Sequence, residues 1–262
     1  MLIKNIIQKL EELYPLTLQE KYDNSGIQIG DIDNELKSIL LSTDITEATV
    51  DEAIASGSNL LISHHPLIFN GLKKITYNTL SGRIITKALK NDIVIYSMHT
   101  NLDKAIGGVS YRMAQKIGLA DLRILSVDHS IQSSTAGLGC VGRLDTPEDE
   151  KQFLLRLKQI FDIKAIRHSH LLNRKIQTVA LCGGSGAEFI DDAISQGADI
   201  YLTADIKYHE YFRPDNQIVI ADIGHFESEH FTKEIIYEQL IKFFPNFACN
   251  MSNADINPVE YT

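Results

Sequence analysis

The chain has 262 residues, of which 44% are hydrophobic, so it can form one large domain or two ordinary ones. Its net charge is −9 and Lys and Arg form no run, which argues against a protein that binds duplex nucleic acid. The three cysteines are widely spaced and lack a CxxC motif, so neither a disulfide framework nor a thiolate zinc site is indicated. Small anionic substrates are compatible with this composition, because a local site can oppose the overall charge.

The first residues favour a cytoplasmic protein. Residues 2–14 place Leu and Ile on one stripe, which predicts an amphipathic helix that ends at Pro15 rather than a signal peptide. No apolar run is long enough to cross a bilayer. We therefore expect a soluble, cytoplasmic protein without a membrane partner.

Strands and helices then alternate along the chain. In the first half we expect strands at residues 27–29, 38–42, 59–63 and 93–98, and helices at 46–55, 78–90 and 109–117. In the second half we expect strands at 138–143, 177–182, 199–203 and 218–223, and helices at 147–161, 187–195 and 228–243. Thr146 is the expected N-cap of the helix that begins at Pro147, and residues from Pro245 onward are expected to be irregular. The pattern predicts an α/β fold with mostly parallel sheets covered by helices.

The two halves also resemble each other. Residues 40–63 align without a gap on residues 180–203, and both blocks run strand, helix, Gly, strand. Identities include Leu41 with Leu181 and Gly57 with Gly197. We expect two similar α/β domains related by internal duplication, at residues 1–126 and 127–262, with a metal cleft at their interface. The C-terminal helix is expected to pack back on the first domain.

Two adjacent histidines, His64 and His65, follow the expected strand at residues 59–63. Pro66 restricts His65 to an extended conformation. The two imidazoles therefore point in different directions at the carboxyl end of a strand, which is where α/β proteins bind ligands. The alternative is a pair of polar histidines in a turn.

Two further strands are each followed by a histidine with a carboxylate four residues later. His99 precedes Asp103 in this way, and His225 precedes Glu229. At this spacing an imidazole and a carboxylate share one face of a starting helix turn, as in other helical metal sites. Each carboxylate alone is also compatible with helix capping.

The combined set of side chains predicts a centre with two divalent cations. One catalytic ion needs only three protein ligands, whereas five ligands with a bridging carboxylate suit two ions. The expected ligands are His64, His65, Asp103, His225 and Glu229. Nitrogen and oxygen ligands fit zinc, manganese, iron, cobalt or nickel without distinguishing among them.

Three other features lie close to these motifs in sequence. His99 is a candidate catalytic proton carrier or further ligand, and Asp205 is a candidate catalytic base or a group that supports a ligand. Glu227 is a third candidate for the general base, and a surface turn is the alternative for Asp205. The glycine-rich residues 183–186 fit either a tight turn or a loop that binds phosphate.

Five short segments together resemble the NIF-three-like family, whose members are often named GTP cyclohydrolase 1 type 2 homologues. They are residues 23–26 (DNSG), 63–66 (SHHP), 99–103 (HTNLD), 203–205 (TAD) and 224–229 (GHFESE). The resemblance implies two similar α/β domains, a toroidal homohexamer and two divalent cations facing its internal cavity. It assigns the cations to the same five ligands. The family's usual Thr-Gly-Asp reads Thr203-Ala204-Asp205 here, so the local turn differs if that glycine serves close backbone approach.

We therefore expect a metal-dependent hydrolase. A divalent cation lowers the pKa of a coordinated water, which can then attack a carbon or phosphorus centre. The family name implies a small-molecule substrate, a guanine nucleotide whose ring is opened by C–N hydrolysis, and a phosphoester hydrolase would use the same ions. The alternative from another class is a non-catalytic hexamer that binds metal or regulates partners.

Overall fold

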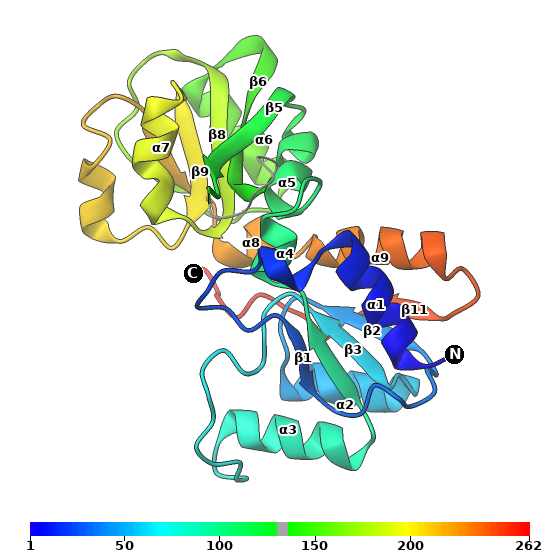
Figure 1. Ribbon diagram of the computed structural model, residues 1–262. Helices are drawn as coiled ribbons and strands as arrows, with labels where there is room; N and C mark the ends of the chain where they lie inside the picture. Colours follow the sequence, from blue (N-terminus) through cyan, green and yellow to red (C-terminus); the bar gives the residue numbers. More distant parts are fainter. Residues whose placement is uncertain (130–135) are drawn as a thin grey trace. The chain divides into compact units, whose positions relative to one another are not determined.

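The chain folds into two compact units. The computed structural model in Figure 1 describes residues 1–129 and 136–262. Unit 1 comprises Met1–Leu102 and His230–Ile256, and unit 2 comprises Asp103–Glu229 and Asn257–Thr262. Each unit contains one sheet, so the fold is mixed α/β as predicted.

Unit 1 is built on a five-stranded sheet in the order β1-β4-β3-β2-β11. Strands β11, β2, β3 and β4 are parallel neighbours, and β1 joins the edge antiparallel to β4. Every residue of β2, β3 and β4 is buried, which explains their continuous apolar runs. The strands are β1 (Gly26–Ile29), β2 (Ile39–Ser42), β3 (Leu60–Ser63), β4 (Val94–Ser97) and β11 (Cys249–Met251).

Helices cover both faces of this sheet. Figure 1 shows α2 and α3 on one face and α1 and α9 on the other. The first pair buries Val50 and Ala53 of α2 and Ile84 and Ala88 of α3 against Leu61 and its strand neighbours. The helical elements of this unit are α1 (Ile3–Leu13), η1 (Leu16–Leu18), α2 (Glu47–Ser56), α3 (Leu80–Lys90) and α9 (Thr232–Phe243). The short helix α4 (Thr100–Asp103) ends at the first residue of unit 2.

Unit 2 is built on a six-stranded mixed sheet in the order β5-β6-β8-β9-β10-β7. Only β8, β9 and β10 are parallel neighbours, and β5, β6 and β7 pair antiparallel. Its strands are β5 (Ala120–Val127), β6 (Gly137–Asp149), β7 (Arg167–His168), β8 (Lys175–Ser185), β9 (Ile200–Ala204) and β10 (Val219–Asp222). Its helical elements are α5 (Val109–Ile117), α6 (Glu150–Ile160), η2 (Ala187–Phe189), α7 (Ile190–Ser195), η3 (Tyr208–Phe212) and α8 (His225–Glu229). Helices α5 and α6 pack on β6 and β8, while α7 packs on the core around Tyr201.

The sheets support the predicted duplication. The series β2-β3-β4 corresponds to β8-β9-β10, since both are parallel and consecutive in space. The next strand is also equivalent, because β1 pairs antiparallel with β4 as β7 does with β10. The opposite edges differ: β11 is parallel to β2, whereas β6 is antiparallel to β8.

Three sequence predictions of local structure were wrong. The helix expected from Pro147 begins at Glu150, because Asp149 rather than Thr146 caps it and accepts a 3.0 Å bond from the backbone nitrogen of Lys151. The helix expected at 228–243 is two helices, α8 and α9. Strands β5 and β11 were not expected; both lie at sheet edges, where polar residues hide the alternation.

The compact units also differ from two contiguous halves. The expected boundary at residues 126/127 falls at the end of β5, which pairs with β6 of unit 2. Part of the polar stretch expected to contain it, residues 130–135, lies outside the described residues. Helix α9 belongs to unit 1, in agreement with a C-terminal helix that returns to the first domain. Within the described part of the chain, none of the helices is both long and apolar enough to cross a membrane.

Candidate metal centre

In unit 1, His64 and His65 directly follow β3. Hydrogen bonds from their backbone nitrogens to the carbonyl oxygens of Ser42 (3.3 Å) and Thr43 (3.0 Å) prolong the pairing between β3 and β2. The rings diverge by 52° with centroids 4.9 Å apart, as expected for adjacent residues at a strand end. His64 is fully buried and His65 is half-buried.

His99 joins these two histidines. It follows β4, and its ring centroid lies 5.3 Å from that of His64 and 5.5 Å from that of His65. Each of the three residues offers a ligand atom within 4.8 Å of the other two. Unit 1 therefore gathers three imidazoles that can share cations.

Each of the three clustered imidazoles, His64, His65 and His99, uses Nδ1 to bind a protein oxygen. The acceptors are the carbonyl oxygen of Met98 for His64 (2.8 Å), Oδ1 of Asp44 for His65 (2.9 Å) and Oδ1 of Asp23 for His99 (2.7 Å). A carbonyl or ionised carboxylate only accepts, so Nδ1 carries the hydrogen. An oxygen partner on Nδ1 is the usual arrangement of metal-binding histidines, which coordinate the ion through the other ring nitrogen.

Asp23 is the most strongly held of these acceptors. Its side chain is fully buried and also accepts hydrogen bonds from Ser25 Oγ and from the backbone nitrogen and hydroxyl of Thr100. Burial raises the pKa of Asp23, but the bonds from His99, Thr100 and Ser25 outweigh it and hold that pKa well below its usual value. Asp23 is thus a permanent carboxylate that fixes the orientation of His99.

In unit 2, His225 and Glu229 lie at opposite ends of α8. Nε2 of His225 is 3.0 Å from Oε2 of Glu229, so the predicted i, i+4 pairing is confirmed, and Glu229 rather than Glu227 is the partner. Nδ1 of His225 lies 2.7 Å from Oδ2 of Asp205, which also accepts a short bond from Ser185 Oγ. A carboxylate therefore holds Nδ1 of His225, as carboxylates hold Nδ1 of His65 and His99 in unit 1.

The two carboxylates alter the charge of His225. Burial lowers the pKa of His225, but the bonds to Asp205 and Glu229 outweigh it and raise that pKa from 6.5 to about 11. The bond to His225 in turn lowers the pKa of Asp205. Nε2 of His225 and Oε2 of Glu229 are the two atoms of this pair that a bound cation would contact.

The glycine-rich segment makes room for Glu229. Gly184 has φ +62°, and a Cβ there would lie 2.2 Å from Oε1 of Glu229. The backbone nitrogen of Gly184 donates to Ser228 Oγ (3.0 Å), and its carbonyl oxygen accepts from Thr203 Oγ1 (2.9 Å). The segment ends β8 and holds α8 closely, which favours the tight-turn interpretation over phosphate binding.

Asp103 is the other carboxylate of the predicted ligand set, beside Glu229. One of its oxygens lies within 4.8 Å of a ligand atom of Glu229, so Glu229 is near both Asp103 and His225. Glu227 instead is buried against Gly224 and accepts a 3.0 Å bond from Nδ2 of Asn257. Ala204, where the family usually has glycine, is an extended residue of β9, and the left-handed residue is Asp205 at φ +56°.

Sequence reasoning missed the carboxylates that hold two of the histidines. The sequence assigns no role to Asp23 beyond the Asp-Asn-Ser-Gly segment of the family resemblance, and nothing in it points to Asp44. Both lie in loops far from their histidines in sequence. The available signal for Asp23 was the Asp-Asn-Ser-Gly segment, in which Ser25 and the aspartate bond each other.

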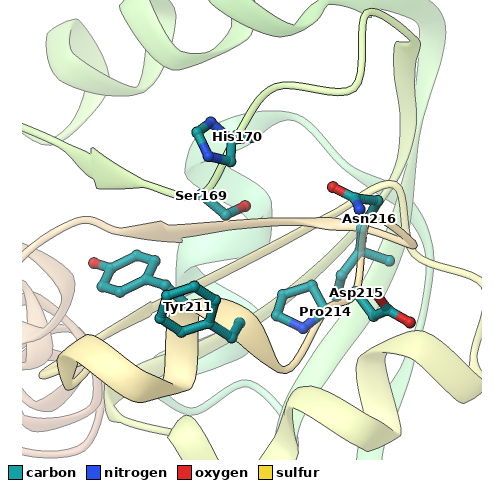
Figure 2. A pocket seen from close by; sticks show the side chains of 8 residues that line it. Ser169, His170, Tyr211, Pro214, Asp215 and Asn216 are labelled. Atoms are coloured by element: carbon teal, nitrogen blue, oxygen red, sulfur yellow. The ribbon is translucent and has the colours of Figure 1, made fainter.

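A separate hollow in unit 2 contains none of these residues. Figure 2 shows it between His170 and the segment that carries Tyr211, Pro214 and Asp215. Its lining residues follow β7 or precede β10, at the strand ends away from α8. The candidate metal centre therefore rests on the side-chain groups described above and not on this hollow.

Comparisons with known proteins identify the family of this chain. Residues 1–258 match the family model described as Duf34/NIF3 (NGG1p interacting factor 3). A Clostridium perfringens protein named GTP cyclohydrolase 1 type 2 homolog is 37% identical over 232 residues, which cover 87% of each chain. A Lactococcus lactis protein with the same name is 31% identical over 98% of each chain.

Solved structures give the same result. A Bacillus cereus protein described as related to NIF3 matches with a TM-score of 0.92 and 26% identity, covering 100% of this chain and 99% of that one. The matches to the family model, the curated relatives and the fold span nearly the whole chain. The chain therefore belongs to the Duf34/NIF3 family.

Proposed function

We propose that the protein binds two divalent cations and is a metal-dependent hydrolase. The proposed ligands are His64, His65, Asp103, His225 and Glu229. The observation that carries the proposal is the orientation of His64, His65 and His225, each of which binds a protein oxygen through Nδ1, as metal-binding histidines usually do. Such oxygen partners fix the ring and increase its basicity toward a metal.

The residues around the ligands have distinct proposed roles. Divalent cations held by such a set supply Lewis acidity and a nucleophilic water near neutral pH. Asp205 positions His225, as Asp23 positions His99. His99 lies among the imidazoles of unit 1, where it can either complete a coordination shell or carry a proton.

The relatives suggest the reaction. Their name, GTP cyclohydrolase 1 type 2 homolog, supports a nucleotide substrate and hydrolysis of a ring C–N bond. Phosphoester hydrolysis would use the same ligand set, because two cations can stabilise attack at phosphorus equally well. A nucleotide screen that scores both ring opening and phosphate release distinguishes these reactions.

A second candidate is a non-catalytic assembly that holds metal. The burial of His64 (0% exposed) and Glu229 (3% exposed) favours it, because ligands closed to solvent suit a structural ion. We propose a homohexamer as the assembly for either function. Light scattering should then give about six times the chain mass of 29.4 kDa.

Metal content per chain tests the proposal. Elemental mass spectrometry of the reloaded protein should give about two ions per chain, and His65→Ala and Glu229→Ala should each lose most of this metal. His129→Ala, which changes an exposed histidine outside the ligand set, should keep it. Absence of metal after reloading with zinc, manganese, iron, cobalt and nickel would overturn both the centre and the hydrolase.

A further inference from the structure

Two exposed aromatic rings lie beside the imidazoles of unit 1. The side chains of Tyr22 and Phe69 are 60% and 44% exposed, which is a large apolar area to leave in water. The ring of Phe69 lies 6.1 Å from that of His99 at an angle of 75°, and 6.3 Å from that of Tyr22 at an angle of 49°. The tilt keeps Tyr22 and Phe69 from covering each other, so the pair presents ring surface next to a candidate ligand.

Phe69 is held in this position by its neighbours. Leu67 packs against the core of unit 1. The backbone nitrogen of Ile68 donates to Oε1 of Gln28 (3.1 Å), and its carbonyl oxygen accepts from Nδ2 of Asn24 (2.6 Å). The chain on the N-terminal side of Phe69 is therefore fixed to the segment around β1.

The same two loops carry the aromatic rings and the groups of the metal centre. Tyr22 immediately precedes Asp23, which binds His99, and Phe69 follows His65 by four residues. The aromatic pair is thus placed by the segments that orient His65 and His99. A ring bound on this pair would lie within reach of a reaction at the imidazoles.

From this arrangement we infer that Tyr22 and Phe69 form the surface that binds the planar ring of the substrate. The inference rests on the proposed function, because it assumes that chemistry takes place at the imidazoles. Its ligand class is a flat heteroaromatic ring, which stacks on aromatic side chains whatever its substituents. Phe69, the ring in contact with His99, contributes most of the binding.

Binding of nucleotides to the metal-loaded protein tests the inference. The probes are GMP and UMP, which carry flat rings, and ribose 5-phosphate, which does not. Isothermal titration should show that Phe69→Leu weakens GMP or UMP binding by roughly 5- to 100-fold, the range for loss of one stacking side chain. Phe69→Trp should retain wild-type affinity, and ribose 5-phosphate should bind both variants as it binds wild type.

Phe212→Leu is the matched control. Phe212 is 66% exposed and forms an aromatic cluster with Tyr208 and His209, none of which is a proposed ligand. Its substitution should leave nucleotide affinity unchanged. Metal content is measured on every variant, so that loss of the metal centre is distinguished from loss of ring binding.

Three results would overturn the aromatic surface while leaving the metal centre intact. They are equal GMP affinity in wild type and Phe69→Leu, equal effects of Phe69→Leu and Phe212→Leu, and no binding of GMP or UMP to metal-loaded wild type. A wild-type protein that takes up no metal would instead overturn the proposed function.

Discussion

The two units place an imidazole at equivalent strand ends but orient it with carboxylates from different parts of the chain. His99 follows β4 and is bound by Asp23, which precedes β1, whereas His225 follows β10 and is bound by Asp205, which follows β9. The end of β3 carries His64 and His65, while the corresponding end of β9 carries Ala204 and Asp205. Duplication therefore preserved the scaffold, while the residues after two equivalent strands diverged into a pair of histidines, the proposed ligands, in one unit and a carboxylate that binds His225 in the other.

The largest effect is expected at Gly184 of unit 2, whose lack of a side chain makes room for the carboxylate of Glu229. Gly184→Ala combines a left-handed backbone with a Cβ contact of 2.2 Å to Glu229. It should lower the free energy of unfolding by about 2–4 kcal/mol and reduce metal content more than tenfold. Urea denaturation and elemental analysis measure the two effects.

Gly197→Ala is the control for backbone strain alone. Its φ is +70°, but a Cβ there meets nothing within 4 Å. It should cost about 1–2 kcal/mol of unfolding free energy and retain the metal. Equal metal loss in both variants would show that the space beside Glu229 is unimportant.

The next largest effect is expected at Asp23 and Asp205, the carboxylates that bind His99 and His225. Asp23→Asn and Asp205→Asn should each weaken metal affinity by roughly 10- to 100-fold, because each loosens one imidazole. Asp23→Asn should also cost about 1–3 kcal/mol of stability, since its side chain is 0% exposed and has several donors. Asp205 is 53% exposed, so Asp205→Asn should change stability by less than about 0.5 kcal/mol. Competition with a chelator measures affinity, and unchanged affinity in either variant contradicts its positioning role.

A smaller effect is expected beside β11, at the edge where the sheets of the two units differ. Asp255 accepts from the backbone nitrogens of Thr43 (2.8 Å) and Asp44 (3.2 Å) and pairs with Lys233 (2.5 Å). It thus fixes the residue that orients His65. Asp255→Asn should lower stability by about 1–3 kcal/mol and metal affinity by several-fold.

Asp33→Asn provides the comparison for this variant. It removes an exposed ion pair with Lys4, worth at most about 1 kcal/mol, and it leaves the segment around Asp44 untouched. If both variants retain wild-type metal affinity, Asp255 serves stability alone.

The smallest effect is a dependence of folding stability on pH, which arises from Glu52 at the same edge. Burial raises the pKa of Glu52, but bonds from Ser252 and the backbone nitrogens of Asn253 and Ala254 outweigh it and lower that pKa below 4.5. Glu52 therefore stabilises the fold above pH 4.5, and this contribution disappears as the pH falls through its lowered pKa. Wild type should exceed Glu52→Gln in stability at pH 7 by less than about 1 kcal/mol, and the gap should close as the pH falls below 4.5. Urea denaturation across this range measures it, and a gap independent of pH would contradict the assignment.

The sequence predicted the buried scaffold well because apolar runs and periodicity report burial. The elements β2, α2, β3 and β4, and the pairing of His225 with Glu229, were found in this way. The edge strands β5 and β11 were missed because an edge strand is mostly solvated and needs no continuous apolar pattern. Asp44 and Asp255 were missed because their partners are distant in sequence and only the folded chain brings them together.

The position of β11 has a consequence for synthesis of the protein. The strand that completes the sheet of unit 1 lies after nearly all of unit 2 in the chain, so unit 2 is topologically an insertion within unit 1. On the ribosome, residues 103–229 can emerge and fold while the first sheet still lacks its last strand. Asp255, which secures the oxygen partner of His65, is among the last residues to be added. A prematurely terminated chain would therefore keep all five proposed ligands and still lack the carboxylate that holds the oxygen partner of one imidazole.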